Sequence, residues 1–147
     1  MTAPTSEQGA STFTLFEPDE IKFSFKIISS ANQNPDHNGR PSPLVLRVYQ
    51  LSDETLFKNS DFYDLYDDDI KVLGRSLKHK DEFSIPVGQT STNNLTIHPQ
   101  TRFISILGGF QDLDNAKAKL SFTIDPKEPE PLCIRIEEKS LVMGQNC

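Results

Sequence analysis

Short segments in which apolar and polar residues alternate recur along most of this 147-residue chain. Successive side chains of a β-strand point to opposite faces, so this two-residue period indicates strands with one buried face. Proline, glycine and asparagine separate the segments at intervals of about 8 to 12 residues, as in β-sandwiches and barrels. We therefore predict an all-β fold, a two-sheet antiparallel β-sandwich. The expected strands cover residues 21–27, 44–51, 82–87, 94–98, 102–107, 119–124, 132–137 and, more briefly, 140–143.

A helical period replaces the two-residue period between residues 53 and 73. We expect one or two short helices there, inserted after the second strand and lying over an edge or face of the sheet. Ser52 and Ser60 each precede acidic residues, which predicts helix starts capped by a hydroxyl group, and Gly74 predicts the stop.

The aromatic and acidic side chains of this helical stretch can serve the core or a partner. Aromatic residues at helical spacing more often anchor a core than bind a ligand. We therefore expect Phe62, Leu65 and Tyr66 to pack inward, whereas the pattern does not decide between a core role and a binding role for Tyr63. The acidic run that ends at Asp69 lacks the spacing of a calcium loop. We expect it to be a solvated helix face near Lys71.

A long turn-rich segment precedes the second strand. Three prolines fix φ in it, while asparagine, aspartate and glycine tolerate the left-handed backbone conformation. A fifteen-residue connection (residues 29–43) without structure of its own is uncommon in a compact domain unless it is functional. We expect it to be a recognition loop, with a passive surface connector as the alternative. Arg40 suits an interface because its planar guanidinium makes several directed bonds.

Composition excludes several classes of function. The net charge is −6 and the pI about 5.0, and Lys and Arg form no cluster, which argues against a nucleic-acid binder or an anionic membrane surface as partner. No run of 18 apolar residues indicates a transmembrane helix. We expect residues 1–15 to be a flexible leader and residues 16–147 to form a single β-sandwich domain.

No arrangement of residues points to catalysis, a metal or a cofactor. His37, His79 and His98 lie outside any zinc-binding spacing, and no serine sits in a nucleophile elbow. We therefore expect no enzyme activity, no metal site and no cofactor. Cys133 is expected to be a small buried apolar residue, and a disulfide with Cys147 is the less favoured alternative.

The order of several short segments resembles the type VI secretion outer-membrane lipoprotein family, TssJ, also called SciN. The resemblance covers residues 21–143. It is carried by Asn34–Leu51, Phe57–Asp69, Asp81–Phe83 and Gly108–Asp114. It implies a structural component of the secretion membrane complex, located in the periplasm at the inner face of the outer membrane. It also implies a transthyretin-like sandwich that binds the periplasmic domain of the inner-membrane component TssM through the loop between its first two strands.

Carried over to this sequence, the partner-binding residues are Asn32, Gln33, Asn34, Pro35, Asp36, His37, Asn38, Gly39, Arg40, Pro41, Ser42 and Pro43. Family members carry a signal peptide and an acylated cysteine, and residues 1–11 show neither. We therefore expect a lipid anchor only if the precursor supplies such a cysteine.

Two functions of other classes stay open. A small-ligand carrier with a β-sandwich fold would need a concave apolar pocket. A glycan-acting hydrolase, the less favoured of the two, would need paired carboxylates across a cleft.

Overall fold

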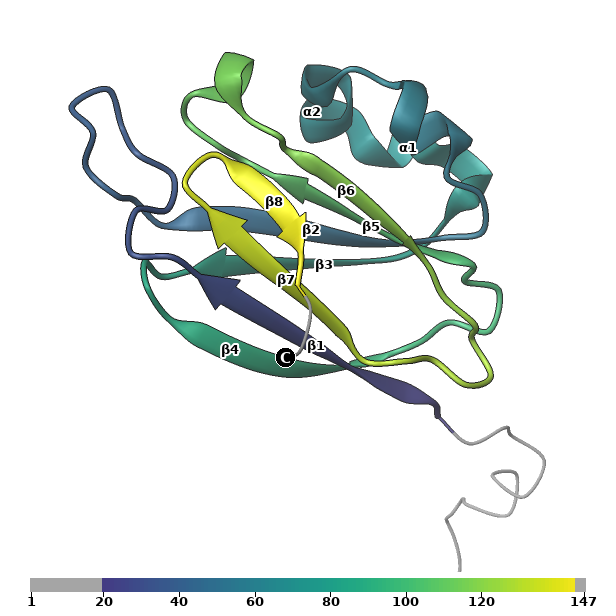
Figure 1. Cartoon of the computed structure of the whole chain (residues 1–147). Coiled ribbons are helices and arrows are strands. Elements are labelled where there is room, and N and C mark those ends of the chain that lie inside the picture. Colours follow the sequence, from purple (N-terminus) through teal and green to yellow (C-terminus); the bar gives the residue numbers. More distant parts are fainter. Residues whose placement is uncertain (1–19, 145–147) are drawn as a thin grey trace, which may run out of the picture.

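The computed structural model describes residues 20–144, and within them eight strands form two facing four-stranded sheets (Figure 1). The first sheet has the order β4-β1-β7-β8. Its strands are β1 (Lys22–Ser29), β4 (Thr90–Thr96), β7 (Leu132–Glu137) and β8 (Ser140–Met143). The second sheet has the order β3-β2-β5-β6. Its strands are β2 (Leu44–Leu51), β3 (Leu77–Ile85), β5 (Phe103–Gly108) and β6 (Lys119–Thr123).

The predicted β-sandwich is confirmed, with two corrections. β1 and β7 pair in parallel, whereas the other ladders of the described residues are antiparallel. β3 and β4 also begin earlier than expected, at Leu77 and Thr90. Both are edge strands whose first residues are mostly polar on both faces, so no alternation announces them in the sequence.

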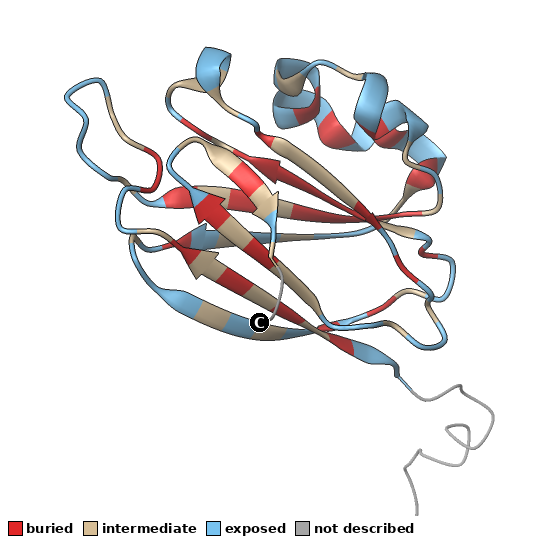
Figure 2. Ribbon diagram, in the orientation of Figure 1, coloured by how far each residue is buried: buried red, intermediate tan, exposed pale blue. Residues whose placement is uncertain are grey.

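The main core fills the space between the two sheets. Alternate residues of β1, Phe23, Phe25 and Ile27, are buried, as the two-residue period predicts. They face β2 and β5, which are internal to the other sheet and therefore apolar along most of their length. Figure 2 shows buried positions, in red, along strands of both sheets. The members of this core include Phe23, Phe25, Ile27, Leu44, Leu46, Ile104, Ile106, Phe110, Phe122, Ile134 and Ile136.

Two helices lie over the outer face of the second sheet (Figure 1). They are α1 (Thr55–Asn59) and α2 (Phe62–Leu73), followed by the 3-10 turn η2 (Gly74–Ser76); a second 3-10 turn, η3 (Leu113–Asn115), lies between β5 and β6. Gly74 ends α2 with φ at 52°, as its expected role requires. The helices form a second apolar cluster with β2 and β5, made of Tyr49, Leu51, Phe57, Leu65, Leu73 and Leu107.

The helix starts differ from the expected hydroxyl caps. Glu54 and Asp61 occupy the N-cap positions, and neither makes a capping hydrogen bond with its side chain. Asp53 instead accepts a hydrogen bond from the backbone N–H of Thr55 (2.8 Å). A backbone N–H at the start of α1 is therefore capped by Asp53, one residue after the predicted cap Ser52.

A kink in α2 turns the expected solvated acidic face partly inward. Asp68 leaves helical geometry, with φ −149° and ψ 52°, and the following Asp69 faces the sheet with an exposed fraction of 6%. Asp69 accepts hydrogen bonds from Tyr49 Oη (2.9 Å), Lys80 Nζ (3.0 Å) and Arg47 Nη1 (3.3 Å). Burial alone would raise the pKa of Asp69, but the bonds from Lys80 and Tyr49 outweigh it and the pKa lies below its ordinary value.

The expected core role is correct for Leu65 and wrong for Tyr66. Leu65 is fully buried, whereas Tyr66 is 36% exposed. The ring of Tyr66 stacks on the half-buried Phe62 at 5.4 Å and lies under the Arg47 guanidinium at 4.3 Å. Tyr66 thus covers a cation at the surface of the helical layer. Tyr63 is exposed.

The expectation of a buried free thiol in β7 is also wrong. Cys133 is half-buried and disulfide-bonded. The other cysteine of the chain, Cys147, lies outside the described residues, as does the expected leader. The boundary at residue 16 therefore stays a prediction.

Candidate functional site

The loop between β1 and β2, residues 30–43, projects beyond the sheets at one end of the sandwich (Figure 1). Backbone hydrogen bonds tie its two arms together and to the first sheet: Ser42 N–H donates to Gln33 O (3.0 Å), and Asn34 N–H donates to Glu138 O (2.7 Å). The base of the loop is therefore held in place by backbone hydrogen bonds within the loop and to the turn between β7 and β8.

Two buried side chains fix that base. The Gln33 amide donates to the carbonyl oxygens of Ser42 (3.0 Å) and Ile85 (2.9 Å). The Asn34 amide donates to Pro43 O (2.9 Å), and its Oδ1 accepts from the backbone N–H of Gln111 (2.9 Å). Asn34 has φ of 49°, a left-handed conformation that asparagine tolerates better than most residues.

The tip of the loop is a compact turn organised by Asp36. Its Oδ1 accepts hydrogen bonds from the backbone N–H groups of Asn38 (2.8 Å) and Arg40 (3.0 Å). The Arg40 Nε lies 3.2 Å from Asp36 Oδ2. These interactions, led by the backbone bond from Arg40, hold the pKa of Asp36 below its ordinary value. Asn34 and Asp36 thus hold the turn through side-chain to backbone hydrogen bonds.

The structure separates the expected partner-binding residues into two groups. Gln33 and Asn34 are buried and support the loop from inside. Ten others are exposed or half-exposed and form its outer surface: Asn32, Pro35, Asp36, His37, Asn38, Gly39, Arg40, Pro41, Ser42 and Pro43. Gly39 has φ of 78°, so the turn needs a residue that accepts the left-handed region.

A polar notch beside the loop adds residues that sequence reasoning missed. It has a volume of about 580 Å³, and the loop forms one wall of it. Its other wall is formed by Gln111, Asp112, Glu138 and Lys139, from the β5–β6 and β7–β8 connections. Lys139 Nζ lies 2.8 Å from Asp112 Oδ2, a contact that lowers the pKa of Asp112 and raises that of Lys139. Three connections far apart in the sequence thus meet at this end.

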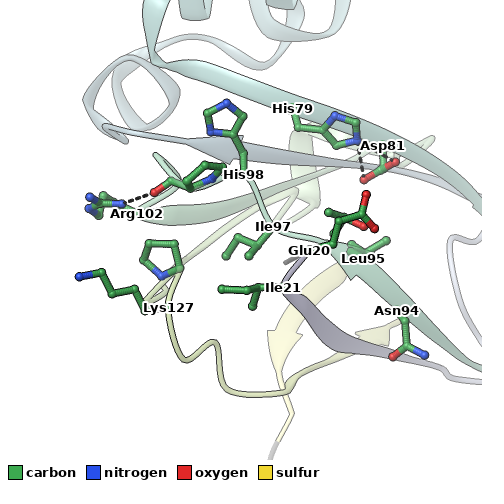
Figure 3. Close-up of a pocket in the computed structure, with 13 residues that line it drawn as sticks. Glu20, Ile21, His79, Asp81, Asn94, Leu95, Ile97, His98, Arg102 and Lys127 are labelled. Atoms are coloured by element: carbon green, nitrogen blue, oxygen red, sulfur yellow. Dashed lines mark hydrogen bonds and ion pairs between the residues drawn. The ribbon is translucent and has the colours of Figure 1, made fainter. Parts of the chain in front are cut away.

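A second cavity lies at the opposite end of the sandwich. This groove has a volume of about 710 Å³, and Figure 3 shows Ile21, Leu95 and Ile97 at its centre. His79, Asp81 and Arg102 lie around them.

No group of metal-ligating side chains is found among the residues that the structure describes. Within residues 20–144, no three His, Cys, Asp or Glu side chains gather closely enough to hold a metal ion. In the same residues, no helix combines the length and apolar character needed to cross a bilayer.

Comparison with known proteins decides the family. A model of the family described as "Type VI secretion lipoprotein, VasD, EvfM, TssJ" matches residues 21–139. The chain belongs to the type VI secretion lipoprotein family. No curated protein sequence matches this chain. Membership in this TssJ family makes it an envelope-associated periplasmic protein of the outer-membrane-anchored type and a component of the secretion membrane complex.

Solved structures of type VI secretion proteins share the fold. The T6SS lipoprotein TssJ1 from Pseudomonas aeruginosa superposes with a TM-score of 0.80 at 25% identity, covering 88% of this chain and 100% of that one. The Lip protein of Serratia marcescens, a membrane-bound component of the type VI secretion system, gives 0.78 at 24% identity, covering 84% and 97%. A chain of a type VI membrane complex gives 0.76 at 20% identity, covering 84% and 98%. The TssJ-like identification and the β-sandwich are thereby confirmed.

Proposed function

We propose that this protein holds the periplasmic domain of TssM at the inner face of the outer membrane and that residues 32–43 make the main contact. The observation that carries the proposal is the placement of the loop. The loop and Glu20, where the described chain begins, lie at opposite ends of the sandwich (Figure 1). A TssJ-type protein anchored through its N-terminal side would therefore present the loop away from the membrane.

The construction of the loop supports a binding role. Pro35, Pro41 and Pro43 restrict the backbone, and the bonds of Asp36 and Asn34 hold the turn in one conformation. A loop ordered before association loses less conformational entropy on binding. Its exposed surface is polar and carries one arginine, a residue enriched among strong interface contacts.

We extend the proposed contact surface beyond the loop. The notch beside the loop places the Asp112–Lys139 ion pair next to Pro35 and His37. A partner segment that docks on the loop would reach this pair. We therefore include Gln111, Asp112, Glu138 and Lys139 in the proposed surface, with Gln33 and Asn34 as its internal supports.

The test replaces residues 36–40 by Gly-Ser and leaves the buried base of the loop in place. Backbone N–H of Asp36 bonds to Arg40 O (2.9 Å), so these residues close the turn and can be shortened without disturbing Gln33 or Asn34. We expect an almost unchanged melting temperature, because loop length affects stability weakly. We expect binding to the purified periplasmic domain of TssM, measured by calorimetry, to fall by at least about 100-fold.

A matched control shortens the connection between β6 and β7 at residues 127–129, which lies at the opposite end of the sandwich. This variant should bind TssM like the parent. If the tip variant melts normally and binds as tightly as the parent, the loop is a passive connector and the proposal fails.

The apolar groove favours a second candidate, a small-ligand carrier, because such a carrier needs a concave apolar pocket. The groove lies away from the loop, so the two functions can be tested separately. A glycan hydrolase has less support. Such an enzyme needs paired carboxylates across a cleft, whereas the two acids in the groove, Glu20 and Asp81, lie on the same side of it (Figure 3). The Asp81 carboxylate also has a partner already, His79 Nε2 at 3.3 Å.

A further inference from the structure

The groove at the end opposite the loop is apolar at its centre and polar at its rim. Ile21 precedes β1, Leu95 lies near the end of β4 and Ile97 follows that strand. Figure 3 shows their side chains converging. Pro99 and Pro126 extend the apolar wall. Charged and histidine side chains, among them Asp81, Arg102 and Lys127, stand around this centre (Figure 3). A concave apolar surface with a polar rim is typical of a binding site.

The polypeptide itself enters this groove. Glu20 and Ile21 belong to its lining, so the nineteen residues that precede Glu20 connect directly to the wall. Ile21 is 37% exposed, although it continues the inward-facing series of Phe23, Phe25 and Ile27. The side chain that begins the core strand is thus incompletely covered by residues 20–144.

The connected segment carries suitable side chains. Phe13, Leu15 and Phe16 lie within four positions of one another, in a stretch otherwise made mainly of small and polar residues. A fully extended chain advances about 3.3–3.6 Å per residue, so the four steps from Phe16 to Glu20 span at most about 14 Å. Pro18-Asp19 between them is a turn-forming pair. These side chains are therefore within reach of the groove to which their own chain leads.

The edge of the first sheet offers backbone partners to such a segment. In the β1–β4 ladder, Ile97 N–H donates to Ile21 O (2.8 Å), and Ser29 N–H donates to Gln89 O (3.0 Å). Bonding alternates along an antiparallel ladder, so the N–H and C=O groups of Asn94, which lines the groove, point away from β1. β4 also lacks charged residues along its whole length, the usual protection of an exposed edge.

We propose that Phe13, Leu15 and Phe16 of the same chain occupy this groove. The segment would cover Ile21, Leu95 and Ile97 and shorten the path between the N-terminus and the sandwich. The inference does not depend on the binding of TssM, because the groove and the loop lie at opposite ends.

The direct test is nuclear magnetic resonance of the full chain. We expect nuclear Overhauser effects between the ring protons of Phe13 or Phe16 and the methyl groups of Ile21, Leu95 and Ile97. They should persist on tenfold dilution. The absence of these effects would overturn the proposal, and effects that disappear on dilution would assign the groove to a second copy and overturn it as well.

A triple variant, Phe13→Ser, Leu15→Ser and Phe16→Ser, provides the second test. It should shift the methyl resonances of Leu95 and Ile97 and leave those of Leu46 and Val48, in the core between the sheets, unchanged, which shows that the fold is retained. It should also bind the dye ANS several-fold more strongly, because an apolar surface is uncovered.

The matched control, Thr12→Ser with Thr14→Ser, alters the same segment without removing apolar area and should resemble the parent. If the parent and the triple variant bind ANS equally well, the groove is open in both, and a small apolar ligand is its occupant instead.

Discussion

The two segments that flank β2 differ in how they are held. Residues 30–43, before the strand, are fixed by polar side chains bonded to the backbone, chiefly Gln33 and Asn34. Residues 55–73, after the strand, are fixed by apolar burial of Phe57, Leu65 and Leu73 on the outer face of the sheet. Directed bonds at the base leave the outer surface of the loop available for a partner, whereas apolar burial commits the helices to the fold. Changes in the helices should therefore affect stability most, and changes in the loop tip should affect binding.

The largest effect on stability is expected in the helical segment. Phe57 is 1% exposed, and its ring centroid lies 5.9 Å from that of Tyr49. Phe57→Ala removes most of a buried ring and leaves a cavity, so the free energy of unfolding should fall by about 3–5 kcal/mol. Urea denaturation monitored by circular dichroism measures this change. Leu56→Ala is the matched control because Leu56 is 47% exposed. An equal loss in both variants would show that the helices do not pack as described.

A smaller loss is expected at the base of the loop. Asn34 is 2% exposed, and Asn34→Ala leaves Pro43 O and the N–H of Gln111 without their partner. Unpaired buried polar groups cost about 1–3 kcal/mol in unfolding free energy. Asn34→Gly relieves the positive φ but loses the same bonds, so the difference between the two variants measures the backbone contribution. Asn38→Ala, at an exposed position, should change stability by less than about 0.5 kcal/mol.

The buried Asp69 should make the helical segment sensitive to acid. Its pKa lies below the ordinary value of 3.8 in the folded protein, so its contribution is complete above that pH and is lost as the pH falls through the folded-state pKa. Asp69→Asn should lower the free energy of unfolding at pH 7 by about 1–2 kcal/mol. At about pH 2 the difference from the parent should shrink. The exposed Asp67→Asn serves as the control, and a difference that is the same at both pH values would contradict the charged role of Asp69.

The smallest effect on stability is expected at the loop tip. Arg40 is 75% exposed and pairs with Asp36 at 3.2 Å, and exposed ion pairs contribute about 0–1 kcal/mol. Arg40→Ala should leave the melting temperature nearly unchanged and weaken binding to the periplasmic domain of TssM by about tenfold. Arg102→Ala, at the opposite end, is the matched control for binding. Equal binding by parent and Arg40→Ala would remove Arg40 from the proposed surface.

The sequence by itself determined the sandwich and the position of the loop. The side-chain period of a strand is fixed by its geometry. The alternation in β1 therefore indicates burial on one face, and the apolar run of β2 indicates burial on both faces. The prolines, Asn34 and Asp36 likewise indicate a stiff turn, because each restricts or bonds the backbone close to its own position. These signals depend on neighbours in the chain, and they were sufficient to predict the position of the loop in the candidate site.

Tertiary structure decided what lies next to these elements. Nothing near Gln33 in the sequence shows that its amide will bond to Ile85 O, fifty-two residues away, or that Asp112 will meet Lys139 beside the loop. The inward turn of Asp69 depends on a kink at Asp68. The position of Tyr66 depends on the cation of Arg47, which comes from β2. Such contacts join segments distant in sequence, so their energies appear only when the two sheets and the helices pack together.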